Sequence, residues 1–109
     1  MALTYKNARQ AVGATYATIY TCPAATTALV LTCQAANVDG AASADVSAQW
    51  LDSSDADAAT RLVELLTVAP KSSVNLLGGP ITLEAGDALQ AKASAAGDIE
   101  ITMAISEIT

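Results

Sequence analysis

The side chains with the clearest potential for catalysis are carboxylates in the last third of the chain. Glu84 and Asp87 flank one predicted turn, and Asp98 and Glu100 begin the last predicted strand. Two carboxylates at a fixed separation could hydrolyse a glycosidic bond. That reaction also needs a sugar cleft with aromatic walls, and a chain with no Phe, one Trp and three Tyr has little material for one. We therefore expect no enzymatic activity.

Histidine is absent from the sequence, which removes the usual general base near neutral pH and the commonest metal ligand. Ser-His-Asp and Cys-His arrangements are thereby excluded. The Gly-Gly-Pro stretch at 78–80 lacks the Lys-Ser/Thr pair and the helix of a phosphate-binding loop. We expect no catalytic residues and no cofactor.

An acidic stretch, DSSDAD, holds Asp52, Asp55 and Asp57 and could supply oxygen ligands to calcium. It lacks the glycine and the terminal glutamate of an EF-hand loop, so we expect a solvated loop and no metal site. Calcium binding by the stretch from Asp52 to Asp57 stays open at this stage.

Cys22 and Cys33 are the two cysteines. If the CPAAT stretch is a hairpin turn centred near Ala25, Cys22 faces Ala28 and Cys33 faces Ala17. The cysteines are then too far apart for a disulfide, which needs Cα atoms within about 7 Å. We expect two buried free thiols, and no zinc site, because neither a His nor a CxxC pair is present.

Alternation with a period of two dominates the chain and predicts strands. The predicted strands cover 14–22, 26–38, 44–52, 60–68, 73–77, 81–84, 87–95 and 98–108. The stretch 60–68 is ambiguous, because the spacing of Leu62, Leu65 and Leu66 also fits a helical turn. We predict a strand there, because Pro70 ends the segment and its neighbours are strands. In the last strand, Ile99, Ile101, Met103 and Ile105 are predicted to face inward.

About eight short strands without a convincing helix predict an all-β fold, an antiparallel β-sandwich of jelly-roll or immunoglobulin-like type, over residues 14–109. About a quarter of the residues are Ala, so the core should be thin, and oligomerisation would add buried apolar surface.

Residues 1–13 carry Lys6 and Arg9 and no acid, whereas the rest holds 3 basic and 11 acidic groups, so +2 and −8 give the net charge of −6. This asymmetry predicts an extended basic N-terminal arm, either a frayed terminus or a segment that docks on a neighbouring subunit. The acidic balance argues against nucleic-acid binding. The apolar runs are too short for a membrane span, and no leader pattern is evident, so we expect synthesis in a cytoplasm and no membrane partner.

The run ATIYTCPAATTALVLTCQAANVDGAASADVSAQWLDSS, followed by LLGGPITLEAGDALQAKASAAGDIEITMAISEI, resembles small virion proteins of tailed bacteriophages. The match covers residues 16–108, and its motifs are structural. The resemblance implies a virion component, commonly one that decorates or cements the capsid surface or sits in tail and neck assemblies. No active-site residues are carried over.

We therefore expect a capsid decoration protein located on the capsid surface and assembled in the host cytoplasm. Its expected partners are the major capsid protein and itself, as a dimer or trimer. The expected contact residues lie in the arm: Leu3, Tyr5, Lys6 and Arg9. One alternative is a tail, neck or fibre-base component. The other is a carbohydrate- or host-receptor-binding module, in which Tyr16 and Tyr20 share one strand face or Trp50 stacks on a sugar.

Overall fold

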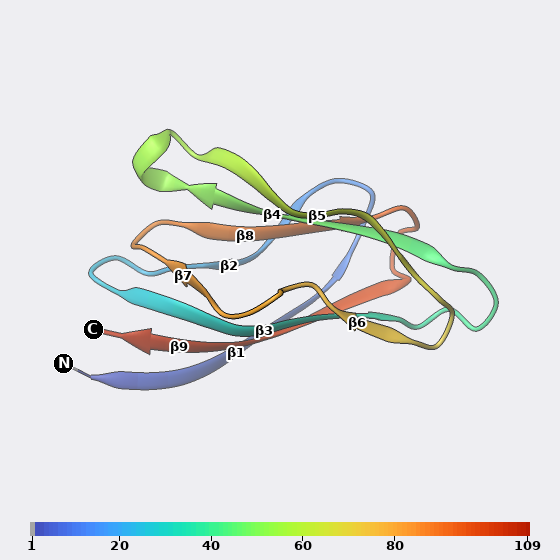
Figure 1. Ribbon diagram of the computed structural model, residues 1–109, viewed down its shortest axis with the longest axis horizontal. Helices are drawn as coiled ribbons and strands as arrows, with labels where there is room; N and C mark the ends of the chain where they lie inside the picture. Colours follow the sequence, from blue (N-terminus) through green and yellow to red (C-terminus); the bar gives the residue numbers. More distant parts are fainter. Residues whose placement is uncertain (1) are drawn as a thin grey trace.

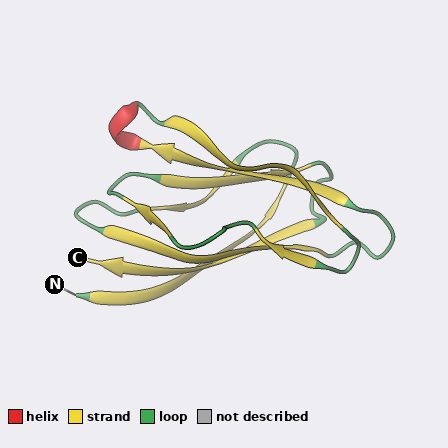
Figure 2. Ribbon diagram, viewed as in Figure 1, coloured by secondary structure: helices red, strands yellow, loops and turns green. Residues whose placement is uncertain are grey.

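The strands of this chain form two antiparallel sheets packed face to face, as seen in a computed structural model that describes residues 2–109 (Figure 1). They are β1 (Leu3–Val12), β2 (Ala17–Thr21), β3 (Thr27–Asn37), β4 (Ala44–Asp52), β5 (Ala58–Val68), β6 (Ser73–Asn75), β7 (Ile81–Leu83), β8 (Ala88–Ala93) and β9 (Ile99–Ile108). Figure 2 shows the 3₁₀ turn η1 (Ser53–Asp55) between β4 and β5. The predicted all-β sandwich is confirmed.

The topology is that of a long hairpin folded over on itself. β4 pairs with β5, β3 with β6 and β7, β2 with β8, and β1 with β9, so the pairs are nested one inside the next. Further pairing of β3 with β9 and of β4 with β8 completes the two sheets. Sheet A has the order β1-β9-β3-β6, with β7 also on β3, and sheet B has the order β2-β8-β4-β5. This nesting is the jelly-roll arrangement, and it decides between the two sandwich types that the sequence left open.

The predicted strand at 60–68 is confirmed as part of β5, and the strands at 73–77, 81–84, 87–95 and 98–108 are found as β6 to β9. The expected hairpin at CPAAT is wrong. β2 lies in sheet B and β3 in sheet A, so residues 22–26 carry the chain from one sheet to the other. Ala25, at φ 56°, sits in this crossing. The register that opposed Cys22 to Ala28 and Cys33 to Ala17 therefore does not exist.

Residues 3–12 are part of the sandwich, which corrects the expected arm and the domain boundary at 14, although Met1 of the expected arm at 1–13 lies outside the described residues. β1 pairs antiparallel with β9 in ten consecutive positions, from Leu3 opposite Ile108 to Val12 opposite Ile99. Backbone hydrogen bonds hold this strand, so it needs few apolar side chains to form. Val12 is 1% exposed and joins the core, and the rest of β1 projects side chains that are mostly exposed.

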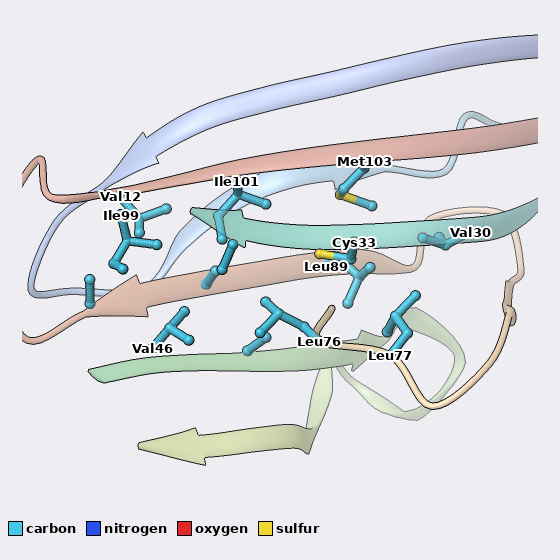
Figure 3. Close-up of a cluster of buried hydrophobic side chains, with 14 of the residues drawn as sticks. Val12, Val30, Cys33, Val46, Leu76, Leu77, Leu89, Ile99, Ile101 and Met103 are labelled. Atoms are coloured by element: carbon cyan, nitrogen blue, oxygen red, sulfur yellow. The ribbon is translucent and has the colours of Figure 1, made fainter. Parts of the chain in front are cut away.

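The core lies between the sheets and is built from small aliphatic side chains (Figure 3). The inward residues of β9 are the predicted ones, Ile99, Ile101, Met103 and Ile105, and all are at most 1% exposed. Alanines such as Ala35 and Ala91 fill the facing positions, which keeps the layers close together. Within residues 2–109, no helix is long and apolar enough to cross a membrane.

Candidate assembly interface

β1 is the sheet edge that carries the least protection against pairing with another chain. It is ten residues long, its register with β9 has no shift, and across residues 2–109 no strand pairs with its other side. Protein edges are usually blunted by shortness, bulges, proline or charged side chains, and of these features β1 has only the charged side chains of Lys6 and Arg9. β2 is five residues long with a register shift, and β6 and β7 are three residues each. β5 is long, but its pairing with β4 shifts twice and Leu65 has a φ of 53°.

The backbone groups of β1 divide cleanly between its two sides. Ala2 and Thr109 exchange two hydrogen bonds of 3.0 Å, which fixes the phase of the β1–β9 ladder. Because donors and acceptors alternate along a strand, the odd-numbered residues direct their N–H and C=O groups away from β9. These are Leu3, Tyr5, Asn7, Arg9 and Ala11. We call this row of backbone groups the open edge of β1.

The same odd-numbered residues place their side chains on the outer face of sheet A, because successive side chains alternate between faces. Leu3 is 55% exposed and Tyr5 is 72% exposed, which makes them two of the few large apolar side chains left in solvent. Arg9 is exposed on the same face. The structure therefore brings together three of the four predicted contact residues, Leu3, Tyr5 and Arg9.

Lys6 is the exception among the predicted contact residues, because it faces inward and has an intramolecular partner. Its Nζ lies 3.0 Å from Oε1 of Glu107, whose side chain is only 7% exposed. The hydroxyl of Tyr20 on β2 donates to Oε2 of the same carboxylate at 2.5 Å. Glu107 therefore ties β1 and β9 of sheet A to β2 of sheet B. Lys6 serves to hold β1 in its register.

The ionisation of this cluster follows from its contacts. The hydrogen bonds from Tyr20 and Lys6 lower the pKa of the Glu107 carboxyl below its ordinary value, so the group is a carboxylate at neutral pH. Burial and the neighbouring carboxylate raise the pKa of the Tyr20 phenol, which stays protonated. The arrangement is a fixed structural ion pair, with no proton poised for transfer near neutral pH.

Asp87, which the sequence offered with Glu84 as a possible pair of catalytic carboxylates, is buried. Its carboxylate accepts hydrogen bonds from within the fold, from the N–H of Ser53 (2.9 Å), the N–H of Glu84 (2.9 Å) and Nε1 of Trp50 (3.3 Å). Burial opposes its ionisation, yet these hydrogen bonds outweigh burial and lower its pKa. Asp87 joins the 84–87 turn to η1, so its role is to hold two loops together.

The aromatic residues of the carbohydrate alternative do not form a shared platform. A register shift between Thr18 and Tyr20 turns Tyr20 inward to Glu107, so Tyr16 and Tyr20 do not share a face as predicted. Tyr16 packs beneath two cations, with Lys92 Nζ at 4.7 Å from its ring centroid and Arg61 Cζ at 5.3 Å. Trp50 is half-buried and bound to Asp87.

The two cysteines are free and buried, as predicted. Burial raises the pKa of Cys33 to about 11 and also raises that of Cys22, so neither is a ready thiolate. In the acidic stretch, Oδ1 of Asp52 accepts from the N–H (3.1 Å) and the hydroxyl (2.6 Å) of Ser54 and caps η1. Among residues 2–109, no group of three potential metal ligands lies together.

Glu107 is the residue of this region that the sequence reasoning missed. Its signal was present, because extending the inward alternation of β9 by one step from Ile105 places Glu107 on the core side. A carboxylate in that position requires a partner. The basic residue able to supply it is Lys6, on the strand that had been predicted to be a separate arm.

Together these features define a jelly-roll β-sandwich with one regular, accessible strand edge and with its buried carboxylates engaged in structural contacts. No protein-family model and no curated protein sequence matches the chain.

Among solved structures, the chain is similar to one from Bacillus endospore appendages, which form a novel family of disulfide-linked pili. The TM-score is 0.56 at 17% identity, over 97% of this chain and 84% of that chain. Two structures of a pentameric capsid protein isolated from metagenomic phage sequences align with 91% of this chain at 21% identity. Their TM-scores are 0.42 and 0.43, and this chain spans 60% and 59% of their length. The first of these likenesses shows a shared fold.

Proposed function

We propose that this chain is a structural subunit that assembles through β1, and that it decorates and cements the capsid of a tailed bacteriophage. The observation that carries the proposal is the combination on β1 of an open backbone edge with exposed Leu3, Tyr5 and Arg9. A surface of that kind binds protein by burying apolar side chains and by adding strands. The resemblance of residues 16–108 to small phage virion proteins supplies the setting.

In this proposal the major capsid protein is the partner of the outer face of β1. Leu3 and Tyr5 bury apolar area against it, and Arg9 pairs with a capsid carboxylate. Lys6 contributes indirectly, because its ion pair with Glu107 keeps the strand in the register that presents the other three residues. The location is the capsid surface, and assembly takes place in the host cytoplasm.

The test is binding to expanded capsids prepared without this protein. We expect the wild-type chain to saturate them and Arg9→Glu to reduce occupancy by about tenfold at the same concentration, because it reverses a charge in the contact. Lys71→Glu, which makes the same reversal on the loop before β6, is the matched control and should bind normally. Equal binding of Arg9→Glu and the wild type would show that β1 does not contact the capsid. Absence of wild-type binding would remove the capsid role.

A tail, neck or fibre-base component is the second candidate. It is favoured by β5, a second long edge strand that lies at the opposite lateral side of the sandwich from β1 (Figure 1). Contacts between two different edges of neighbouring copies produce rings or filaments. Copy number in purified particles separates the candidates, because a closed shell offers many more equivalent positions than a single ring does. The Bacillus appendages are disulfide-linked, whereas Cys22 and Cys33 of this chain are free and buried.

A further inference from the structure

We infer that the open edge of β1 pairs antiparallel with the same edge of a second copy of this chain, with Asn7 on the two-fold axis. The inference rests on the proposed role of β1 as the assembly strand. It assigns the open backbone edge of β1 to a second copy of this chain, whereas the proposed function assigns the outer face of β1 to the major capsid protein. Pairing of identical edges closes after two copies, so it produces a dimer and not a fibre.

The geometry of the edge restricts which residues can oppose one another. A two-fold axis perpendicular to the joined sheet keeps the inner faces of both copies on the same side. Odd-numbered residues must therefore oppose odd-numbered residues, which are also the ones whose backbone groups point outward. Every allowed register is then centred on a single residue of β1.

The Asn7-centred register is the one that uses the whole edge without opposing like charges. Each of the five outward-directed residues, Leu3 through Ala11, then finds a backbone partner in the other copy. Centring on Lys6 or Arg9 places that cation opposite itself, which destabilises a strand pair. Centring on Tyr5 or Ala8 leaves part of the edge without a partner. The sequence of β1 is therefore self-complementary about its middle residue.

The side chains fit the same register. Tyr5 of each copy lies opposite Arg9 of the other, which forms two cation–π pairs on the outer face. Leu3 lies opposite Ala11, so the exposed leucine is covered by a small apolar side chain. Lys6 lies opposite Ala8 on the inner face and keeps its bond to Glu107. The two Asn7 amides meet at the axis, where each can donate to and accept from the other.

The joined strands would turn the two copies of sheet A into one continuous sheet with β1 at its centre. The interface consists mainly of one strand pair, so it falls at the small end of stable protein interfaces, which bury about 800 Å² per partner. We therefore expect a reversible dimer with a dissociation constant in the micromolar range, roughly 1–100 μM.

Charge substitution at the axis tests the register directly. Sedimentation equilibrium of the purified full chain should show a monomer–dimer equilibrium for the wild type. Asn7→Lys and Asn7→Glu should each weaken dimerisation by about tenfold or more, because residue 7 then opposes an identical charge. An equimolar mixture of the two variants should restore a dimer at least as tight as the wild type. Gln34→Lys and Gln34→Glu, on the exposed outer face of β3, are the matched controls and should not change the equilibrium.

A wild-type chain that stays monomeric at millimolar concentration would overturn the inference. So would an oligomer that neither charge variant weakens, or a mixture that gives no heterodimer. If the variants at residue 7 fail to fold, Tyr5→Ala and Arg9→Ala replace them, and each must weaken the dimer. These experiments contain no capsids, so they test the dimer independently of the proposed function. A chain that dimerises but does not bind capsids would support this inference and contradict the proposed function.

Discussion

The ion pair between Lys6 and Glu107 gives the sharpest prediction about the stability of β1. Lys6→Met keeps the aliphatic stem of the side chain and removes the charge, so it leaves a buried carboxylate with Tyr20 as its remaining donor. Removing one partner of a fully buried pair costs about 3–5 kcal/mol, and an exposed pair contributes about 0–1 kcal/mol. The Lys6 side chain is 51% exposed and that of Glu107 is 7% exposed. We therefore expect an intermediate loss of about 1–2 kcal/mol.

A double-mutant cycle at fixed protein concentration measures this pair. Lys6→Met should lower Tm by about 5–10 °C, as expected for a domain of this size. Glu107→Gln still accepts from Tyr20 but no longer attracts the lysine, so the double variant should show a coupling of about 1 kcal/mol. Denaturant unfolding followed by circular dichroism gives the four free energies.

The pH dependence of the same variants provides the control. The pKa of Glu107 is lowered on folding, so its stabilisation is present above the ordinary glutamate pKa. That contribution is lost as pH falls through the folded-state value. The stability gap between the wild type and Glu107→Gln should therefore narrow in acid. A coupling near zero at neutral pH, or a gap that widens in acid, would refute the assignment of Glu107 as the residue that holds β1.

Three further experiments, two substitutions and one labelling measurement, test the rest of the fold. Asp87→Asn should cost about 2–3 kcal/mol in urea unfolding, because an amide NH₂ replaces an acceptor that three N–H donors share. Equal stability of the variant and the wild type would contradict the hydrogen-bonding role of Asp87. Gly86→Ala should cost about 1–3 kcal/mol, because Gly86 has a φ of 89° and a Cβ there would lie 2.8 Å from Oγ of Ser53; a neutral effect on Tm would show that the turn relaxes freely. Cys22 and Cys33 should react with a thiol reagent only on unfolding, and rapid labelling of the native chain would contradict their burial.

The strands could be predicted from the sequence because successive side chains of a strand point to opposite faces of the sheet. Apolar and polar residues therefore alternate along a strand with one buried face. β9 shows this best, since its inward isoleucines and Met103 are placed as the pattern indicates. The partners of the strands were not predictable in the same way. Pairing of β2 with β8 joins segments about seventy residues apart, and nothing local to CPAAT distinguishes a hairpin from a crossing between sheets.

The N-terminal strand was predicted to be a separate arm because its polar, basic composition is also that of a solvated terminus. Polar side chains are compatible with an edge strand whose stability comes from backbone bonds to β9 and from Val12. The bulge that turns Tyr20 away from Tyr16 was also beyond prediction, because a one-residue slip has no strong local signature. Three of the four predicted contact residues nevertheless share one exposed face.

Amide hydrogen exchange along β1, resolved residue by residue by NMR, tests most directly whether this strand is the assembly edge. The amides of Leu3, Tyr5, Asn7, Arg9 and Ala11 should exchange freely in the dilute chain and become protected on assembly. Those of Thr4, Lys6, Ala8 and Gln10, which face β9, should be protected in both states. Odd-numbered amides that stay unprotected in the assembled state would contradict the account.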